Sequence, residues 1–397
     1  MAEVSGATQQ AHPADAREPS KAPVLHVAPS PHAFDSARTT RKMMADVLIA
    51  LAPVVAVSIY VFKLYAVRQI VICMISAPLA EAIFTTLRGK KVTLGDCSAA
   101  VTGLILALSL PGTAPWYVGV IGAFVAIGIG KVIFGGLGQN IFNPAMVGRA
   151  FVMLAFAGAV GASGYVLKTE APAGPAAATT QTSQAARTVP PGATTAPAAP
   201  ARVSPVANVP EGDAITQATP MTWGKTVDNK LAAGEKLLPQ EEHLPSLGSL
   251  FLGTVNGSLG ETSALACLIG GLFLLLRRTA SWQIPAGVLL AATAIGLPVQ
   301  IWGHSQMSLG YQLLAGALMF GAFFIATDLV TSPITPKGKF IFGLGVGALV
   351  MLFRLLSNYP EGVMFAVLIM NGLTPLINQW TIPTPLGGPV PAPAAEK

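Results

Sequence analysis

Three acidic residues could perform chemistry within an otherwise apolar chain. Glu81, Asp96 and Asp328 fall inside or at the mouths of apolar segments. A charge in the membrane costs at least about 2.5 kcal/mol on insertion scales, so such residues usually face a cavity or a partner subunit. They are candidates for an ion path or a subunit contact. Two other interpretations stay open, because Asp96 could cap a helix beginning at Cys97 and Glu81 could reach water near the membrane surface.

A second cluster lies in "GKVIFGGLGQNIFNPAMVGRAF", residues 130–151. Its glycines allow a ligand or another backbone to approach closely. Asn140 and Asn143 offer hydrogen-bond donors and acceptors just before Pro144, which is well placed at a helix start. The pattern indicates a structured connection that could bind a planar polar ligand, and a purely structural connection is the alternative.

A third feature is the threonine pattern "DAITQAT", which occupies the most polar part of the chain. Asp213, Thr216 and Thr219 recur at intervals of three residues. On composition alone this is an ordinary Ala/Thr-rich loop. Similar tetrads end at Thr8 in "SGATQQ" and at Thr194 in "PPGATTAP".

Other kinds of site find little support in the sequence. Three of the five histidines lie within residues 12–32, and we find no nucleophile elbow, P-loop or metal-binding constellation. The three cysteines fit neither a disulfide framework nor a cluster motif and are expected to be packing residues: Cys73, Cys97 and Cys267.

The elements that must position these residues are membrane helices. Of the 397 residues, 52% are hydrophobic and only 11% are charged, and the mean hydropathy is +0.60. The apolar runs are about 20 residues long, which suits helices that cross a bilayer. We therefore expect an all-α integral membrane protein with about ten transmembrane helices, near residues 43–61, 67–86, 97–110, 115–134, 144–164, 262–276, 282–301, 309–327, 339–356 and 362–379.

These helices divide five and five, which predicts two inverted repeats. The third segment of each half is short or interrupted by glycine, which favours broken helices near a midplane site, with bent packing helices as the alternative. The predicted domains are a tail (1–42), a first repeat (43–164), a loop (165–261), a second repeat (262–379) and a tail (380–397). Within the loop, residues 166–210 cannot build a core, whereas residues after 211, including Leu250 and Phe251, could pack against the helices.

The basic residues indicate topology rather than nucleic-acid binding. With the N-terminus inside, eleven lysines and arginines fall on cytoplasmic segments, including Lys131, and three fall on outer connections, Lys63, Arg68 and Arg354. This positive-inside bias places both termini in the cytoplasm and the loop 165–261 outside. The first 40 residues lack the apolar core of a leader peptide, so no cleaved signal is expected.

Six stretches in order resemble the NqrB/RnfD family of membrane flavoproteins. They are "SPHAF", "GDCSAAVTGLILALSLP", "GKVIFGGLGQNIFNPAMVGRAF", "DAITQATP", "GSLGETSALACLIGGLFLLLRRTASWQIP" and "FFIATDLVTSPITPKGKFIFG". The resemblance runs from about Ser30 to Asn378. It implies ten helices in a subunit of a redox-driven ion pump within the bacterial cytoplasmic membrane. "GGLGQN" and "DLVTSPITPKG" look more like the D subunit of the Rnf complex than the quinone-reducing branch.

The resemblance also implies cofactors. FMN would be joined to Thr219 by a phosphoester bond, with Asp213 and Thr216 at matching positions of the motif, although Gln217 replaces the family's glycine. The decoys fit less well, since Thr8 is expected inside, away from the external flavin transferase, and Thr194 lacks the preceding aspartate. A noncovalent riboflavin is implied near Asn140 and Asn143.

The implied function is electron transfer between ferredoxin and NAD coupled to Na⁺ or H⁺ translocation. Glu81 and Asp328 match acidic positions associated with ion coupling in the quinone-reducing branch. The chain would act only with partner subunits that hold iron–sulfur clusters and further flavins. The alternatives are the NqrB subunit of a quinone reductase and, in another class, a ten-helix permease without a redox cofactor.

Overall fold

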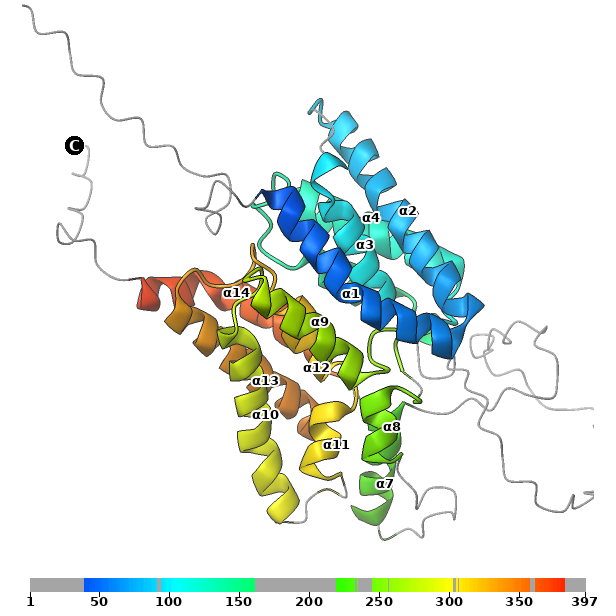
Figure 1. The fold of residues 1–397 in the computed structure, drawn as a ribbon, viewed down its shortest axis with the longest axis vertical. Coiled ribbons are helices and arrows are strands. Elements are labelled where there is room, and N and C mark those ends of the chain that lie inside the picture. The colour runs from blue at the N-terminus through cyan, green and yellow to red at the C-terminus, as the bar shows by residue number, and fades with distance from the viewer. Residues whose placement is uncertain are drawn as a thin grey trace, which may run out of the picture.

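The structure is a computed structural model that describes residues 39–90, 94–160, 219–232, 234, 245–255, 257–302, 305, 307–357 and 361–382. Across these ranges every regular element is helical (Figure 1). Most of the N-terminal tail, of the loop 165–261 and of the C-terminal tail lies outside the described residues.

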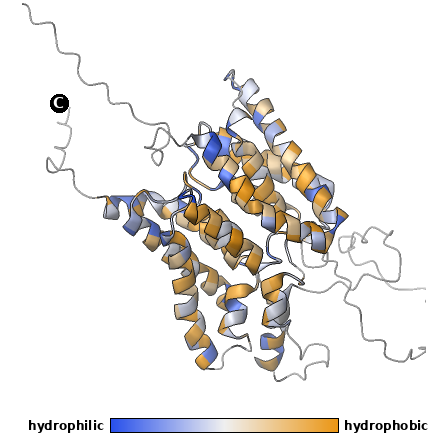
Figure 2. Ribbon diagram, in the orientation of Figure 1, coloured by the Kyte–Doolittle hydropathy of each residue, from blue (hydrophilic) through white to orange (hydrophobic). Residues whose placement is uncertain are grey.

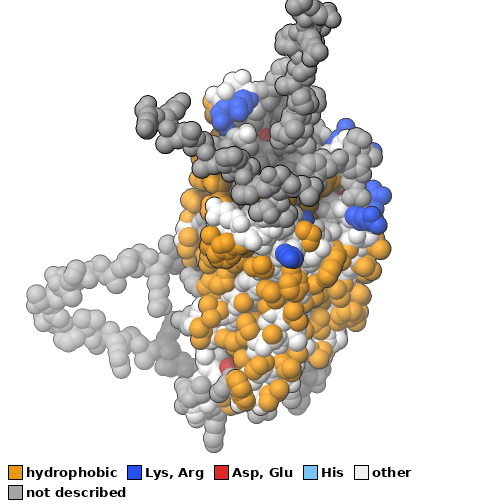
Figure 3. All heavy atoms as spheres, turned by 90° about the vertical axis from the view of Figure 1, so that its left-hand side faces the viewer, with side chains coloured by type: hydrophobic (Ala, Val, Ile, Leu, Met, Phe, Trp, Pro, Cys, Tyr) orange, Lys and Arg blue, Asp and Glu red, His pale blue; other side chains and the backbone are white. Residues whose placement is uncertain are grey.

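Five helices are long and apolar enough to cross a membrane. They contain 19 to 24 residues, or about 28–36 Å at 1.5 Å per residue, which matches a hydrocarbon core of about 30 Å. These helices are α1 (Thr40–Phe62), α2 (Leu64–Leu87), α10 (Gln283–Ile301), α13 (Pro336–Leu356) and α14 (Val363–Thr381). The expected multi-pass, all-helical membrane protein is confirmed. Apolar residues predominate along the helices (Figure 2), and hydrophobic side chains cover much of the face shown in Figure 3.

Four shorter apolar helices lie among the long ones. They are α3 (Ser98–Ser109), α4 (Trp116–Ile127) with the π-helix Gly128–Val132 that extends it, α5 (Pro144–Ala155) and α9 (Ala264–Leu276). The predicted segment 144–164 was too long for a single helix. α5 ends at Ala155, a short α6 (Ala157–Val160) follows, and residues 161–164 lie outside the described ranges.

Side-chain caps fix several helix starts. Asn143 accepts a hydrogen bond from the Met146 amide at the start of α5, and Thr335 accepts one from the Gly338 amide at the start of α13. In both cases proline follows the cap at a position where its missing N–H costs nothing. α13 contains the whole predicted span near 339–356 and begins earlier, at Pro336, because the Thr335–Pro336 pair starts the helix.

The segment 309–327 is interrupted. It consists of α11 (Leu309–Leu314), α12 (Leu318–Phe320) and the π-helix Gly321–Ile325. Gly316 lies between α11 and α12 with φ of +72°, and a Cβ there would lie 1.5 Å from the Glu361 carboxylate. The expected broken helix is present, because only glycine fits both the backbone angle and the neighbouring carboxylate.

Two short helices precede α9 at the end of the bundle where α11 begins. They are α7 (Pro220–Ala232) and α8 (Leu247–Leu252), which lie at the bottom of Figure 1. Met221 and Leu250 are almost fully buried in a small apolar cluster with Met307 and Tyr311. The expectation that this part of the loop packs against the helices is confirmed for Leu250.

Glycines bring the helix backbones into contact. A Cβ on Gly343 or Gly347 of α13 would lie 2.4 Å from a carbonyl oxygen of α10, that of Ile284 or Val288 respectively. The same close approach joins α1 to α9 at Gly270 and α4 to α5 at Gly148. In a bilayer, where hydrophobic burial does little to bring helices together, such close packing is a main source of association.

This packing predicts a contrast between two glycines of one helix. Gly347→Ala should destabilise the protein by about 1–3 kcal/mol, because the methyl group meets the rigid Val288 carbonyl. Gly345→Ala should be nearly neutral, because its methyl group meets only the flexible end of Met370 and alanine favours the helix. Thermal denaturation of both variants in detergent measures the difference, and equal midpoints would contradict the packing argument.

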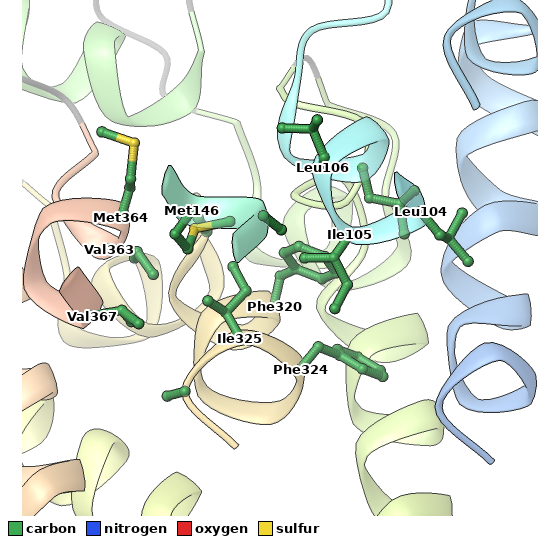
Figure 4. Packing of buried hydrophobic residues seen from close by; sticks show 14 of the residues in the cluster. Leu104, Ile105, Leu106, Met146, Phe320, Phe324, Ile325, Val363, Met364 and Val367 are labelled. Atoms are coloured by element: carbon green, nitrogen blue, oxygen red, sulfur yellow. The ribbon is translucent and has the colours of Figure 1, made fainter. Parts of the chain in front are cut away.

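The two halves of the chain meet in a buried core around α12 and the π-helix Gly321–Ile325. Ile105 of α3 faces Phe320 and Phe324, and Met146 of α5 lies beside Ile325 (Figure 4). The rings of Phe320 and Phe324 are 5.6 Å apart. Segments that are far apart in the sequence therefore pack directly against each other.

The two ends of the bundle differ in charge. At one end, here called the basic end, Arg277 pairs with Asp46 at 3.1 Å, Lys339 donates to Ser281 at 2.7 Å, and Arg88 donates to the Val132 carbonyl. At the opposite end, here called the Thr219 end, α7 and α8 cover α11. The loop threonine and these three basic residues thus lie at opposite ends of the molecule.

Two residues of the positive-inside pattern are buried. Lys131 and Arg354 are only 1% and 3% exposed, so neither is a free charge on a connection. The Lys131 ammonium and the Arg354 guanidinium form buried ion pairs, because a charge surrounded by helices needs a partner.

Candidate functional site

The centre of the candidate site is a buried ion pair. The Lys131 ammonium, on the π-helix Gly128–Val132, lies 2.6 Å from Glu81 Oε1 of α2. The Glu81 side chain is 3% exposed, so it does not reach water in this structure. The other carboxylate oxygen, Oε2, is buried without a hydrogen-bond partner. A π-turn places one extra residue in the helix, and such turns are common at functional sites.

Lys131 also connects Glu81 to Asp96. Its ammonium donates to Ser98 Oγ at 2.6 Å, and that hydroxyl donates to Asp96 Oδ1 at 2.7 Å. Asp96 accepts the Ser98 amide as well, at 2.9 Å, so it satisfies the first amide of α3. Asp96 thus bonds to the first residue of α3, although the N-cap residue of that helix is Cys97, whose side chain makes no capping hydrogen bond. Two of the three candidate acids therefore belong to one hydrogen-bonded chain.

A cavity at the basic end adjoins this chain. Its volume is about 80 Å³, room for several water molecules. It lies between the two halves, and its walls come from α1, the start of α3, the connection before α5, the end of α9 and residues 324–330. The polar residues of its lining are Ser98, Thr102, Lys131, Asn140, Asn143, Thr279, Thr327 and Asp328. Glu81 and Asp96 are not in the lining.

The two asparagines of the glycine-rich connection both line the cavity but differ in their bonding. Asn143 Oδ1 caps α5, and its amide nitrogen donates to the Ile325 carbonyl at 3.3 Å, which joins the two halves. Asn140 Nδ2 donates to the Phe142 carbonyl at 3.3 Å, while Asn140 Oδ1 is buried and has no partner. Asn140 therefore offers a free acceptor at the cavity, whereas the Asn143 side chain is largely used within the protein.

Asp328 is the third candidate acid, and it lines the same cavity from the second half of the chain, just after the π-helix Gly321–Ile325. Its carboxylate accepts the Val330 amide at 3.3 Å and the Thr331 hydroxyl at 3.1 Å. Asp328 and the ion-paired Lys131 therefore line one cavity. Glu81 and Asp96 are connected through Lys131 and Ser98, and Asp328 lines the cavity that Lys131 and Ser98 also line.

Thr219 lies at the other end of the molecule, at the start of α7. Its hydroxyl accepts the Thr222 amide at 3.2 Å and lies 2.8 Å from Thr222 Oγ1, so it caps the helix. Tyr311 of α11 anchors this turn by donating to the Pro220 carbonyl at 2.9 Å. The remaining motif residues, Asp213, Thr216 and Gln217, and the decoys Thr8 and Thr194, lie outside the described residues.

A second buried charge cluster was missed from the sequence. Arg354 of α13 donates to the carbonyls of Gln312 and Ala315 and lies 3.4 Å from Glu361 Oε1. A further pair, Arg149 with Glu261, is 3.5 Å long and is also buried. The sequence does contain a sign that these basic residues are buried, because each directly follows an apolar run. "GVGALVMLF" precedes Arg354, and "VAIGIG" precedes Lys131.

Glu361 lies in the connection between α13 and α14, and burial raises the pKa of its carboxyl from 4.5 to about 7 despite the nearby Arg354. Between pH 4.5 and about pH 7, the folded protein therefore binds more protons than the unfolded chain. Stability should fall by about 3 kcal/mol as the pH rises from about 4.5 to about 7, and stay lower above it.

This pH dependence has a direct test. The thermal denaturation midpoint of the native protein in detergent should be lower at pH 8 than at pH 5.5, and Glu361→Gln should reduce that difference. Asp46→Asn, at the basic end, is the control and should leave it unchanged. An unaltered difference in Glu361→Gln would mean that another group carries the effect.

Comparison with known proteins identifies the family. The chain matches the NQR2, RnfD, RnfE family model over residues 26–387. It is 37% identical over 359 residues to the D subunit of the Na(+)-translocating ferredoxin:NAD(+) oxidoreductase complex of Acetobacterium woodii, covering 90% of this chain and 93% of that protein. It is also 37% identical over 371 residues to the D subunit of the proton-translocating ferredoxin:NAD(+) oxidoreductase complex of Clostridium ljungdahlii, covering 92% and 96%.

A third relative is the D subunit of the ion-translocating oxidoreductase complex of Halorhodospira halophila, 38% identical over 357 residues, with 88% of this chain and 93% of that protein covered. The resemblance drawn from the six sequence motifs is confirmed. With a match over most of its length, the chain belongs to the NQR2, RnfD, RnfE family.

Proposed function

We propose that this chain is the D subunit of an Rnf-type complex, which transfers electrons between ferredoxin and NAD and couples that transfer to ion translocation. The observation that carries the proposal is the near full-length similarity to three proteins named as D subunits of ion-translocating oxidoreductase complexes. As one subunit among several, the chain would need neighbours that hold the ferredoxin and NAD sites, iron–sulfur clusters and further flavins. The membrane would be the bacterial cytoplasmic membrane.

The proposed fold of the chain is ten transmembrane helices in two inverted repeats. The recurring contacts support it: α2 packs on α4 and α4 on α5 in the first half, as α10 packs on α13 and α13 on α14 in the second. The first helices of the two halves, α1 and α9, pack on each other. Under this proposal both termini are cytoplasmic, together with the basic end, and the Thr219 end is external.

The first proposed cofactor is FMN, joined to Thr219 by a phosphoester. The position of Thr219 supports this, because its oxygen lies at the N-terminus of the 13-residue α7. Free amides and the helix dipole stabilise negative charge at that place, so a phosphate would be favoured there. Asp213 and Thr216 complete the proposed motif, and an external flavin transferase would attach the group.

The second proposed cofactor is a noncovalent riboflavin in the cavity at the basic end. Asn140 Oδ1 fits this proposal as a buried acceptor without a partner, which a ring N–H could satisfy. The residues that would hold it are Asn140, Asn143 and the polar residues around them. A cavity of about 80 Å³ requires some lining side chains to move before a flavin ring enters.

These two proposed sites lie at opposite ends of the bundle, which supports electron transfer from one membrane face to the other. The bound flavins would supply the redox chemistry, and the chain would position them and exclude water. Attachment at Thr219 removes the entropic cost of binding a free cofactor at the external site.

The ion path is proposed to involve Glu81, Asp96 and Asp328. Two observations support this: Asp328 lines the cavity, and Glu81 and Asp96 are joined by a hydrogen-bonded chain through Lys131 and Ser98, which line it too. The relatives named above translocate Na⁺ in one case and protons in another, so their names do not decide which ion this chain moves.

One assay of the purified complex separates the main alternatives. We expect bound flavin and electron transfer between reduced ferredoxin and NAD. Quinone reduction by NADH, without a ferredoxin reaction, would instead identify the NqrB branch. A complex with no flavin at all would favour a permease and would contradict the proposal.

A further inference from the structure

The cavity at the basic end contains a fixed positive charge on one wall. Lys131 lines it, is 1% exposed and has two of its three N–H groups bound, by Glu81 and by Ser98. The third N–H is not engaged by either of these contacts. A molecule that enters the cavity therefore comes close to an ammonium group whose position is fixed by Glu81 and Ser98.

The two carboxylates that stabilise this ammonium do not line the cavity. Glu81 contacts Lys131 directly, and Asp96 acts through Ser98. Lys131 therefore stands between Glu81 and the cavity, and a ligand experiences the positive member of the pair more strongly. Asp328 is the opposing charge, since it lies in the lining, where Val330 and Thr331 donate to its carboxylate.

Such an arrangement has a specific effect on an electron carrier. A ring that accepts an electron gains negative charge, and a nearby cation in a low-dielectric site favours that reduced form. Little rearrangement is needed, because Glu81, Ser98 and the surrounding helices already fix the ammonium. Asn140 Oδ1, a buried acceptor without a partner in the same lining, could accept a hydrogen bond from a polar ligand there.

We propose that Lys131 is a positioning and tuning residue for the electron carrier in this cavity: it raises the reduction potential of the carrier, and Glu81 limits that rise while holding the ammonium in place. This inference rests on the proposed function, since it assumes a noncovalent flavin there. It assigns Lys131 and Glu81 opposite effects on a single measured quantity.

The test is a spectroelectrochemical titration of the noncovalent flavin in the whole purified complex. Glu81→Gln should raise the potential, because the ammonium loses its opposing charge. The double variant Glu81→Gln with Lys131→Met should lower the reduction potential below that of the native complex. A tenfold change in a one-electron equilibrium corresponds to about 59 mV. Using the double variant avoids leaving a buried carboxylate without its partner.

Two controls separate tuning from simple structural damage. Lys131→Arg keeps the cation and should stay near the native potential. Lys339→Met removes a partly buried lysine at the same end, bonded to Ser281 and absent from the cavity lining, and should not change the potential. Flavin released on denaturation is measured for every variant to establish occupancy.

The outcomes distinguish this inference from the proposed function. Opposite shifts in Glu81→Gln and the double variant, at equal flavin content, would support it. Equal potentials in all variants, with flavin bound, would overturn the role of Lys131 while leaving the proposed function intact. A native complex that releases no noncovalent flavin would overturn the cavity assignment and this inference together.

Discussion

Lys131→Met alone is expected to lower the free energy of unfolding by about 3–5 kcal/mol, because it leaves the buried Glu81 carboxylate without its counter-charge. The Glu81 side chain is 3% exposed, and one of its oxygens already lacks a partner. The single variant should therefore denature at a much lower temperature in detergent, or fail to accumulate in the membrane.

The double variant Lys131→Met with Glu81→Gln should recover most of that loss. Burying two neutral side chains of similar size avoids the desolvation penalty of both charges, so a buried pair often contributes little net stability. Lys339→Met is the matched control, since that lysine bonds to a serine rather than to a carboxylate. If the single and double variants were equally unstable, the Lys131–Glu81 pairing would not be the cause.

The largest functional effect is expected for Asp328→Asn. Asparagine has nearly the same shape and can still accept the Val330 amide, so the loop should keep its conformation. The variant removes a negative charge from the cavity lining, and under the proposed function that charge belongs to the ion path. We expect flavin content close to native and ion transport reduced at least tenfold.

The measurement is ion uptake by proteoliposomes that contain the whole complex, normalised to the electrons transferred. Asp228→Asn provides a control, since Asp228 lies on α7 at the Thr219 end, where it accepts a hydrogen bond from Ser305, and is not in the cavity lining. Transport per electron at the native level in Asp328→Asn would exclude the carboxylate from ion coupling. A loss of flavin would show instead that Asp328 holds the cavity together.

Much of the fold followed from hydropathy, because a bilayer of fixed thickness sets the length of each helix. The Pro144 helix start and the break near Gly316 were also predictable from local residue types. The start of α13 lies before its apolar span, because Thr335 caps the helix and Pro336 begins it. The π-helix at Lys131 was not predictable, since a π-turn depends on tertiary packing rather than on a local pattern.

The candidate site was only partly predictable. Glu81 and Asp328 stood out because acids are rare in apolar segments, but their partners could not be inferred. Lys131 lies 50 residues from Glu81, and nothing in the local sequence of either residue indicates that the two charges pair. Pairings over such distances depend on how the helices pack. The free acceptor on Asn140, in contrast to the occupied Asn143, likewise emerges only when the halves are assembled.

The covalent attachment of a flavin to this chain can be measured directly. Cells that possess the flavin transferase would express the native chain and Thr219→Val, and in-gel flavin fluorescence of the denatured polypeptides would be compared. We expect fluorescence from the native chain and none from Thr219→Val, while Thr8→Val and Thr194→Val remain fluorescent. Fluorescence that persists in Thr219→Val would move the attachment elsewhere, and no fluorescence from the native chain would contradict the covalent flavin itself.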